Sequence, residues 1–268
     1  MTLNELGRSL LWPISSTENI MKIIVLLILS LLTVVLVFLQ APIPQDPLYH
    51  QFADQREFSG IPNVLNVITN LPYLIFGIMG VKALSVNQTV QILSGTRYIY
   101  QVFFIAVCLI GVGSGYYHLS PDNASLFWDR LPISIAFMSF FTIVVAEYID
   151  KKLAIILFPL FLFVGLASVV FWYWTESIGQ GDLRPYILVQ LLPIVLMLAI
   201  LLMYKPCFSQ SYFFWLVLVC YALAKVFEVM DAAVFELLGV LSGHTLKHLV
   251  SSVAPLLIYI TLNQRKRV

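Results

Sequence analysis

The stretch MKIIVLLILSLLTVVLVFLQ, residues 21–40, contains a single charged side chain, that of Lys22. A helix of about 20 apolar residues is long enough to cross a hydrocarbon core about 30 Å thick. In lipid, backbone N–H and C=O groups must be paired within helices or closed barrels, and the alternating pattern of barrel strands is absent here. The stretch therefore predicts a membrane-spanning α-helix.

Apolar runs of similar length recur along the rest of the chain and are joined by short connections. The chain has 60% hydrophobic and 11% charged residues, whereas a water-soluble protein has about twice that charged fraction. The pattern predicts an all-α, polytopic membrane helical bundle, with an N-terminal segment (1–48) that holds one extra transmembrane helix and a seven-helix core (49–268). The eight expected spans are residues 20–40, 63–85, 96–118, 129–148, 152–174, 184–204, 211–233 and 243–262.

Lysine and arginine residues are concentrated in alternate connections, and this sets the expected orientation. In short loops, the cytosolic side carries the excess of positive charge. Both termini are therefore predicted to be cytosolic, and the connection between residues 118 and 129 is predicted to lie near the outer, non-cytosolic face. The predicted cytosolic side carries Arg8, Lys22, Lys82, Arg97, Lys151, Lys152, Lys205, Arg265, Lys266 and Arg267, and the other side carries Arg56, Arg130 and Arg184 among several acidic residues.

The overall charge and the cysteines argue against two other classes of protein. The formal net charge is +1, so no basic surface for nucleic acid is expected. Cys108, Cys207 and Cys220 lie far apart in or beside apolar runs. We interpret them as packing residues without a disulfide framework.

Three of the four histidines are predicted to lie at one membrane depth. His118 ends an outward-going span, and His244 and His248 begin an inward-going one. The spacing of four places the last two imidazoles on one helix face, and the positive end of that helix disfavours an imidazolium there. Three neutral imidazoles can hold Zn²⁺ tetrahedrally with one position open for water, which is the arrangement of catalytic zinc sites.

Other interpretations of the histidines stay open at this stage. A His-x-x-x-His pair at a helix start also suits an interfacial pair that hydrogen-bonds to its neighbours. A bis-histidine haem site is a further alternative, although haem ligands usually face each other from different helices. The matched depth of His118 favours zinc. His50 lies in the polar segment after the first span and is expected at the surface, without a role.

Ser114 and Asp129 are candidate catalytic residues beside the histidines. Ser114 precedes His118 by one helical turn and shares its face, so its hydroxyl could donate a hydrogen bond to an oxyanion. The alternative is packing, because Gly111-x-x-x-Gly115 is a close-approach motif between membrane helices. Asp129 could act as a general base toward water activated by zinc, or it could be the N-cap of its helix.

Three motifs carry a resemblance to a known family. The stretches GSGYYH (113–118), WDRLP (128–132) and SGHTLKH (242–248) resemble the alkaline ceramidase family. That family belongs to a group of seven-helix membrane hydrolases that includes the progestin and adiponectin receptors and the Per1-type proteins, and the resemblance covers residues 49–262. It implies zinc bound by His118, His244 and His248, with Ser114 and Asp129 as catalytic residues.

Two further features of that family are present in altered form. Its Asn-x-x-Ser-Asn signature reads here as Asn66-Val-Ile-Thr69-Asn70, with Thr in place of Ser. Some members hold calcium with acidic residues ahead of this signature. Asp54 and Glu57 are present here, but Asn63 stands where a glutamate is expected, which weakens the case for calcium.

Charged residues within the spans are costly in lipid and point to function by default. Lys225, Glu228 and Asp231 are predicted to share one face of the helix 211–233, as a Lys–Glu pair with Asp231 as a possible partner of a metal ligand, the role that the resemblance implies. Lys247 is expected to extend its amine to the interface. Glu147 is expected to be solvated at the cytosolic end of its span.

These features predict a zinc-dependent integral-membrane amidase that hydrolyses ceramide-like lipids to a long-chain base and a fatty acid. One alternative keeps the site and takes another amide- or ester-linked membrane lipid. A second alternative is a non-catalytic, receptor-like bundle with structural zinc. A transporter would show broken helices in paired halves, and the sequence has no such pairing.

Overall fold

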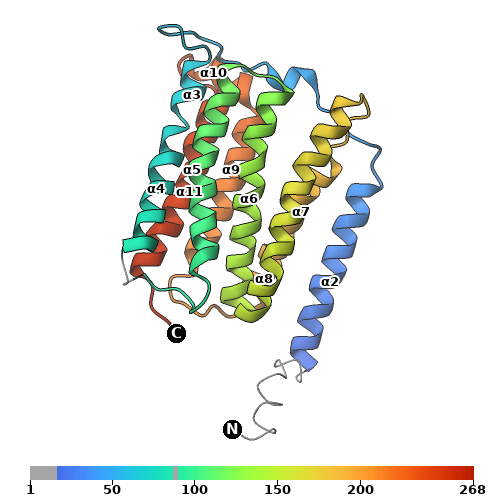
Figure 1. The fold of residues 1–268 in the computed structure, drawn as a ribbon, viewed down its shortest axis with the longest axis vertical. Helices are drawn as coiled ribbons and strands as arrows, with labels where there is room; N and C mark the ends of the chain where they lie inside the picture. The colour runs from blue at the N-terminus through green and yellow to red at the C-terminus, as the bar shows by residue number, and fades with distance from the viewer. Residues whose placement is uncertain (1–16, 87–89) are drawn as a thin grey trace, which may run out of the picture.

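The computed structural model of the chain describes residues 17–86 and 90–268. Arg8, on which part of the predicted orientation depends, lies outside the described residues. Within these residues the fold is an all-α bundle, and eight helical segments are long and apolar enough to cross a membrane. The predicted class, a polytopic helical bundle, is confirmed (Figure 1).

The long helices stand side by side, and α6 is the most buried of the eight candidate spans (Figure 1). Helix α5 packs against α4 and α6, α7 packs against α6 and α8, and α11 packs against α9 and α4. The extra helix α2 lies at the edge of the bundle against α8. The bounds are α2 Thr17–Phe38, α4 Leu71–Val86, α5 Arg97–Leu119, α6 Asn123–Tyr148, α7 Lys151–Ser177, α8 Arg184–Met203, α9 Tyr212–Val229 and α11 Gly243–Gln264.

Two of the predicted spans are interrupted. The run 63–85 begins with the short helix α3 (Val64–Ile68) and continues as α4 after Thr69 and Asn70. The run 211–233 ends as α9 at Val229, and a separate helix, α10 (Asp231–Leu238), follows it. Both interruptions lie at the end of the bundle where α11 begins (Figure 1).

The α5–α6 hairpin brings the serine, histidine and aspartate motifs to that same end. Only residues 120–122 separate the two helices. Asp122 caps α6 by accepting a hydrogen bond from the Ser125 backbone N–H, and the Ser125 hydroxyl accepts one from the Asp122 backbone N–H. A side chain at Gly113 would collide with the Trp128 carbonyl oxygen, so glycine allows the helices to touch here.

At the opposite end of the bundle, a buried ion pair joins α6 to the C-terminal segment. The carboxylate of Glu147 accepts from Arg265 Nη1 at 2.7 Å, and the two side chains are 1% and 2% exposed. The Tyr100 hydroxyl donates to Glu147 and accepts from Arg265 Nη2. The expectation that Glu147 is solvated is therefore wrong.

Candidate metal centre

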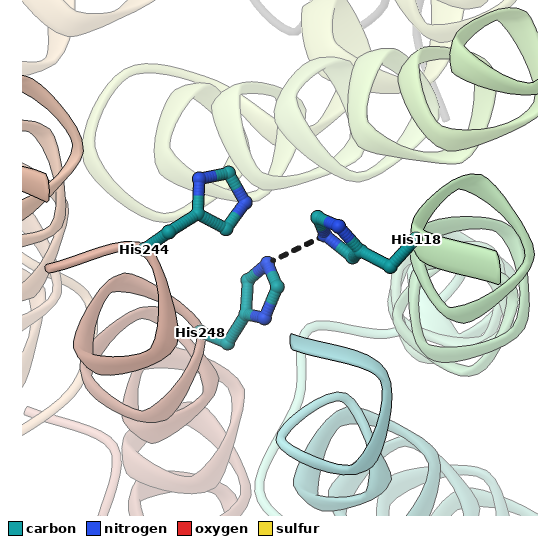
Figure 2. Close-up of side chains that lie close together, drawn as sticks. All are labelled: His118, His244 and His248. Atoms are coloured by element: carbon teal, nitrogen blue, oxygen red, sulfur yellow. Dashed lines mark hydrogen bonds between the residues drawn. The ribbon is translucent and has the colours of Figure 1, made fainter. Parts of the chain in front are cut away.

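His118, His244 and His248 converge from two helices that are far apart in the sequence (Figure 2). Their candidate ligand atoms all lie within 4.8 Å of one another, and all three side chains are buried. The Nε2 atoms of His118 and His248 are 3.3 Å apart. Two nitrogens held tetrahedrally by one zinc ion lie about 3.3–3.4 Å apart, because each Zn–N bond is about 2.0–2.1 Å. The described residues contain no other group of three His, Cys, Asp or Glu side chains that meets this criterion. The histidines can therefore hold a metal ion.

The break between α3 and α4 orients the His248 ring. The Thr69 hydroxyl donates to the Leu65 carbonyl at 2.6 Å and lies 3.1 Å from His248 Nδ1. A hydroxyl has one proton, so with that proton on Leu65 the Thr69 oxygen accepts from Nδ1–H. This shorter contact favours a proton on His248 Nδ1, with the Nε2 lone pair directed at His118, over the longer contact of 3.5 Å between Nδ1 and the Asn70 amide nitrogen. Second partners of this kind fix the ring and the tautomer of metal-ligating histidines.

The start of α11 is fixed by the junction between α9 and α10. The Asp231 carboxylate accepts from the His244 backbone N–H at 2.7 Å and from the Ala53 backbone N–H at 2.9 Å. A side chain at Gly243 would collide with the Phe227 carbonyl oxygen. Asp231 therefore positions His244 through its backbone. The expected shared face with Lys225 and Glu228 is wrong, because Asp231 begins α10.

The Asn66 and Asn63 side chains connect the histidine-bearing helices to the segment before α3. Asn66 Oδ1 accepts from the Thr245 hydroxyl at 2.9 Å, and Asn66 Nδ2 donates to the Asp54 carbonyl at 3.3 Å. Asn63 Nδ2 donates to the His118 carbonyl at 2.9 Å. The Asn-x-x-Thr-Asn signature thus contacts α11 both at Thr245 and at His248.

The segment that precedes α3 covers the histidines. The Phe52 ring lies 4.6 Å from the His118 ring and 4.7 Å from the His244 ring, measured between centroids. His50 is half-buried, with ring nitrogens 2.9 Å from the Tyr117 hydroxyl and 3.1 Å from Asn123 Oδ1. His50 was expected at the surface without a role, and the structure places it half-buried between these two partners. Nothing in the sequence pattern distinguished Phe52 from other aromatic residues.

Ser114 and Asp129 lie buried at the same end of the bundle, 4% and 9% exposed. The Ser114 side chain lies close to the Asp129 carboxylate, and Asp129 Oδ1 has no hydrogen-bond partner. Because α6 begins at Asn123 and Asp122 is its cap, the alternative that Asp129 caps the helix is wrong. The packing alternative holds in part, because Gly111 meets the α4 backbone whereas Gly115 faces open space.

A cavity of about 500 Å³ lies inside the bundle and reaches this site at Asp129. The three histidines do not line it, so Asp129 is the residue that the cavity and the site share. Its lining on α6 runs from Asp129 to Phe140, a helix length of about 16 Å. That is about half of a hydrocarbon core. Most of the lining is apolar, as in Phe103, Ile133, Ile194 and Val217.

Charged side chains gather at the Asp129 end of this cavity. Glu228 accepts from Lys225 at 2.6 Å and from Lys247 at 2.7 Å, and the Tyr49 hydroxyl donates to it at 3.2 Å. The predicted Lys225–Glu228 pair is confirmed. Lys247 is paired inside the cavity, so the expectation that it extends to the interface is wrong.

The acidic residue expected near a calcium site is paired with an arginine. Asp54 is 2% exposed and accepts from Arg56 Nε and Nη2, both at 2.8 Å. These hydrogen bonds hold the pKa of the Asp54 carboxyl below its usual value. Arg56 Nη2 also donates to the Val240 carbonyl at 2.5 Å, so the Asp54 carboxylate, a candidate calcium ligand, is occupied by a guanidinium.

The three cysteines are free, as expected. A comparison of the chain with protein-family models, with curated proteins and with solved structures gives no significant match. The resemblance to alkaline ceramidases therefore stays a prediction, carried by the motifs alone.

Proposed function

We propose that this chain is a zinc-dependent amidase of membrane lipids, similar to alkaline ceramidases. Two observations carry the proposal: a buried three-histidine group, and Asp129, which is buried at the same end of the bundle and lines an apolar cavity. Three imidazoles are donors that suit Zn²⁺ and leave a fourth position for substrate or water. A structural zinc site is closed by four protein ligands and needs no cavity beside it. A cavity about as deep as one lipid leaflet therefore favours a site that binds a lipid.

The cavity supports a lipid substrate that enters from the bilayer. Helix α8 packs against α6 and α7, helix α9 packs against α11, and both α8 and α9 line the cavity. An acyl chain of the substrate would lie along Phe140 and Val217, with its amide group near Asp129. From the lysine and arginine distribution, both termini are placed in the cytosol and the site near the outer face.

A bound zinc ion would supply Lewis acidity toward the amide carbonyl and acidify a water molecule. Asp129 would accept a proton from the water as the water oxygen bonds to the carbonyl carbon and the carbonyl π electrons move to the carbonyl oxygen. Once Asp129 is protonated, the Ser114 hydroxyl can turn its one proton to the oxygen that becomes negative and donate a hydrogen bond to it. Asp129 then returns the proton to the nitrogen as the C–N bond breaks. The products are a fatty acid and a long-chain base. The motifs alone favour ceramide-like lipids over other amide- or ester-linked lipids.

The test combines a metal assay with a substrate panel. Protein purified in detergent is analysed for bound metals and incubated with ceramides of several chain lengths, and released fatty acid is measured by mass spectrometry. We expect about one zinc per chain and fatty acid release that His244→Ala abolishes together with the metal. His50→Ala is the matched control and retains the metal, because His50 contacts Tyr117 and Asn123. Full hydrolysis by metal-free protein would overturn the proposal.

A further inference from the structure

Arg130 is a buried cation at the cavity without a carboxylate partner. Its side chain is 6% exposed and lines the cavity. Among residues 17–86 and 90–268, no carboxylate oxygen lies within ion-pair distance of its guanidinium. Burying an unpaired charge costs several kcal/mol, so the position calls for a compensating group.

The neighbours hold the guanidinium in place without neutralising it. Nη2 donates to Gln45 Oε1 at 2.6 Å. The group also lies over the rings of Trp172 and Tyr186, at 4.2 and 4.8 Å from their centroids. Stacking of this kind fixes the plane of an arginine and suits it to recognise carboxylate or phosphate. Every one of these contacts is to an uncharged group.

Two hydrogen-bond donors at this position have no acceptor. Arg130 Nη1 and the neighbouring indole Nε1 of Trp172 are both buried and both lack a partner. Buried donors are almost always paired in native proteins. An oxyanion supplied by a ligand would give an acceptor to Arg130 Nη1 and offset its charge.

The other cations of the cavity are already paired. Lys225 and Lys247 share Glu228, and Asp129 is the second carboxylate in the lining. The lining therefore holds three cations, Arg130, Lys225 and Lys247, against two carboxylates. Asp129 offsets part of the Arg130 charge from a distance, but it makes no ion pair with the guanidinium, so Arg130 is the cation of the lining that has no carboxylate partner.

We infer that Arg130 binds an anionic head group and that, among the amide-linked lipids left open by the proposed function, those with a carboxylate or phosphate next to the amide are preferred over neutral ceramides. This substrate class rests on the proposed function, whereas the anion subsite rests on the contacts of Arg130 alone. Gln45 and Tyr49, which contact Arg130 from the segment before α3, place the subsite at the outer end of the cavity. The acyl chain occupies the apolar remainder.

The test compares two probes that differ only in charge. N-oleoylglycine carries a carboxylate where N-oleoylethanolamine carries an uncharged hydroxymethyl group, and the acyl amide is otherwise the same. Dissociation constants are measured by titration calorimetry of the purified protein in detergent. We expect the acid to bind at least about tenfold more tightly, because a charge-assisted hydrogen bond is about twice as strong as a neutral one.

Single-residue variants show which side chain causes the preference for N-oleoylglycine. In Arg130→Gln the ratio of the two dissociation constants should fall to about one, while binding of N-oleoylethanolamine stays within about twofold. Lys225→Gln is the matched control, a paired cation of the same cavity, and should keep the wild-type ratio. His248→Ala, which disables the metal centre, should also keep it. A ratio near one in the wild-type protein overturns the inference even if Arg130→Gln fails to fold.

Two other outcomes separate the inference from the proposed function. If the preference persists in Arg130→Gln and disappears in His248→Ala, the metal holds the carboxylate and the Arg130 subsite is excluded. If the preference follows Arg130 but neither probe nor any ceramide is hydrolysed, the amidase proposal fails and the anion subsite stands.

Discussion

The Thr69 hydroxyl lies 3.1 Å from Nδ1 of His248 while it donates its own proton to the Leu65 carbonyl. This pair connects the short helix α3 to a candidate metal ligand. Thr69 lies between α3 and α4, which both pack against α11. The break between the two helices therefore adjoins the candidate metal centre.

Removing that hydroxyl should weaken metal binding. Thr69→Val is expected to lower metal affinity about 10–100-fold, the usual effect of losing a partner of a ligating histidine. Competition with a chelator of known affinity measures it. Thr69→Ser retains the hydroxyl and should bind metal as the wild-type protein does. Equal affinity in the valine variant would show that Thr69 does not hold the tautomer.

Asp129 should be needed for turnover and not for metal binding. Asp129→Asn is nearly isosteric and cannot accept a proton, so the rate of fatty acid release should fall by about 10²–10⁴-fold. Metal content should stay at the wild-type level. If Asp129→Asn releases fatty acid at the wild-type rate, Asp129 is not the general base and has only a structural role.

The Ser114 hydroxyl should contribute less than Asp129. Ser114→Ala removes one donor to the oxyanion, which typically costs about 10²–10³-fold in rate. It also removes a hydroxyl that lies close to the Asp129 carboxylate. Gly115, one residue on, faces open space, and Gly115→Ala serves as the control. A change in metal content rather than in rate would argue for a packing role.

The eight spans and the convergence of the histidines followed from the sequence, and the reasons are physical. The thickness of the hydrocarbon core sets the length of an apolar span at about 20 residues, so the hydropathy of the sequence predicts the spans directly. The matched depth of His118 and His248 followed from alternation of the spans. The spans and the matched depth of the histidines both follow from the thickness of the membrane, so they can be predicted without knowing how the helices pack.

Two of the wrong predictions concern charged side chains whose partners lie on other elements of the fold, and a third concerns the start of a helix. Glu147 was expected in solvent, but Arg265, more than a hundred residues later, buries it. Lys247 was expected at the interface, but Glu228 on another helix pairs with it. The start of α6 was placed at residue 129, because hydropathy does not register the polar first turn that Asp122 caps.

The Asp54–Arg56 pair predicts that calcium does not change the stability of the segment before α3. Because Arg56 holds the carboxylate oxygens of Asp54, the melting temperature in detergent should be the same with millimolar Ca²⁺ and with a calcium chelator. A rise in melting temperature with Ca²⁺ in the wild-type protein would show that the site takes calcium after all.

The Asp54–Arg56 pair should also make the melting temperature of the protein depend on pH. The pKa of Asp54 in the folded protein is held below its usual 3.8 by hydrogen bonds from Arg56. A carboxyl with a depressed pKa stabilises the fold above its unfolded pKa and loses this contribution as the pH falls through the folded value. The difference in melting temperature between wild type and Arg56→Ala should be largest above about pH 5. It should decrease as the pH falls below 3.8. Lys82→Ala, at an exposed cation of α4, should show no such gap.

The buried ion pair at the other end of the bundle should behave asymmetrically on substitution. Arg265→Met leaves Glu147 buried without its cation and should destabilise the protein by about 3–5 kcal/mol. The double variant with Glu147→Leu removes both charges and should recover most of that loss, because two apolar side chains can replace a buried pair at little cost. Unfolding by denaturant in mixed micelles compares the variants, with Lys266→Met as the exposed control. If the double variant is as unstable as Arg265→Met, the hydrogen bonds of Tyr100 to the pair contribute more than the charges themselves.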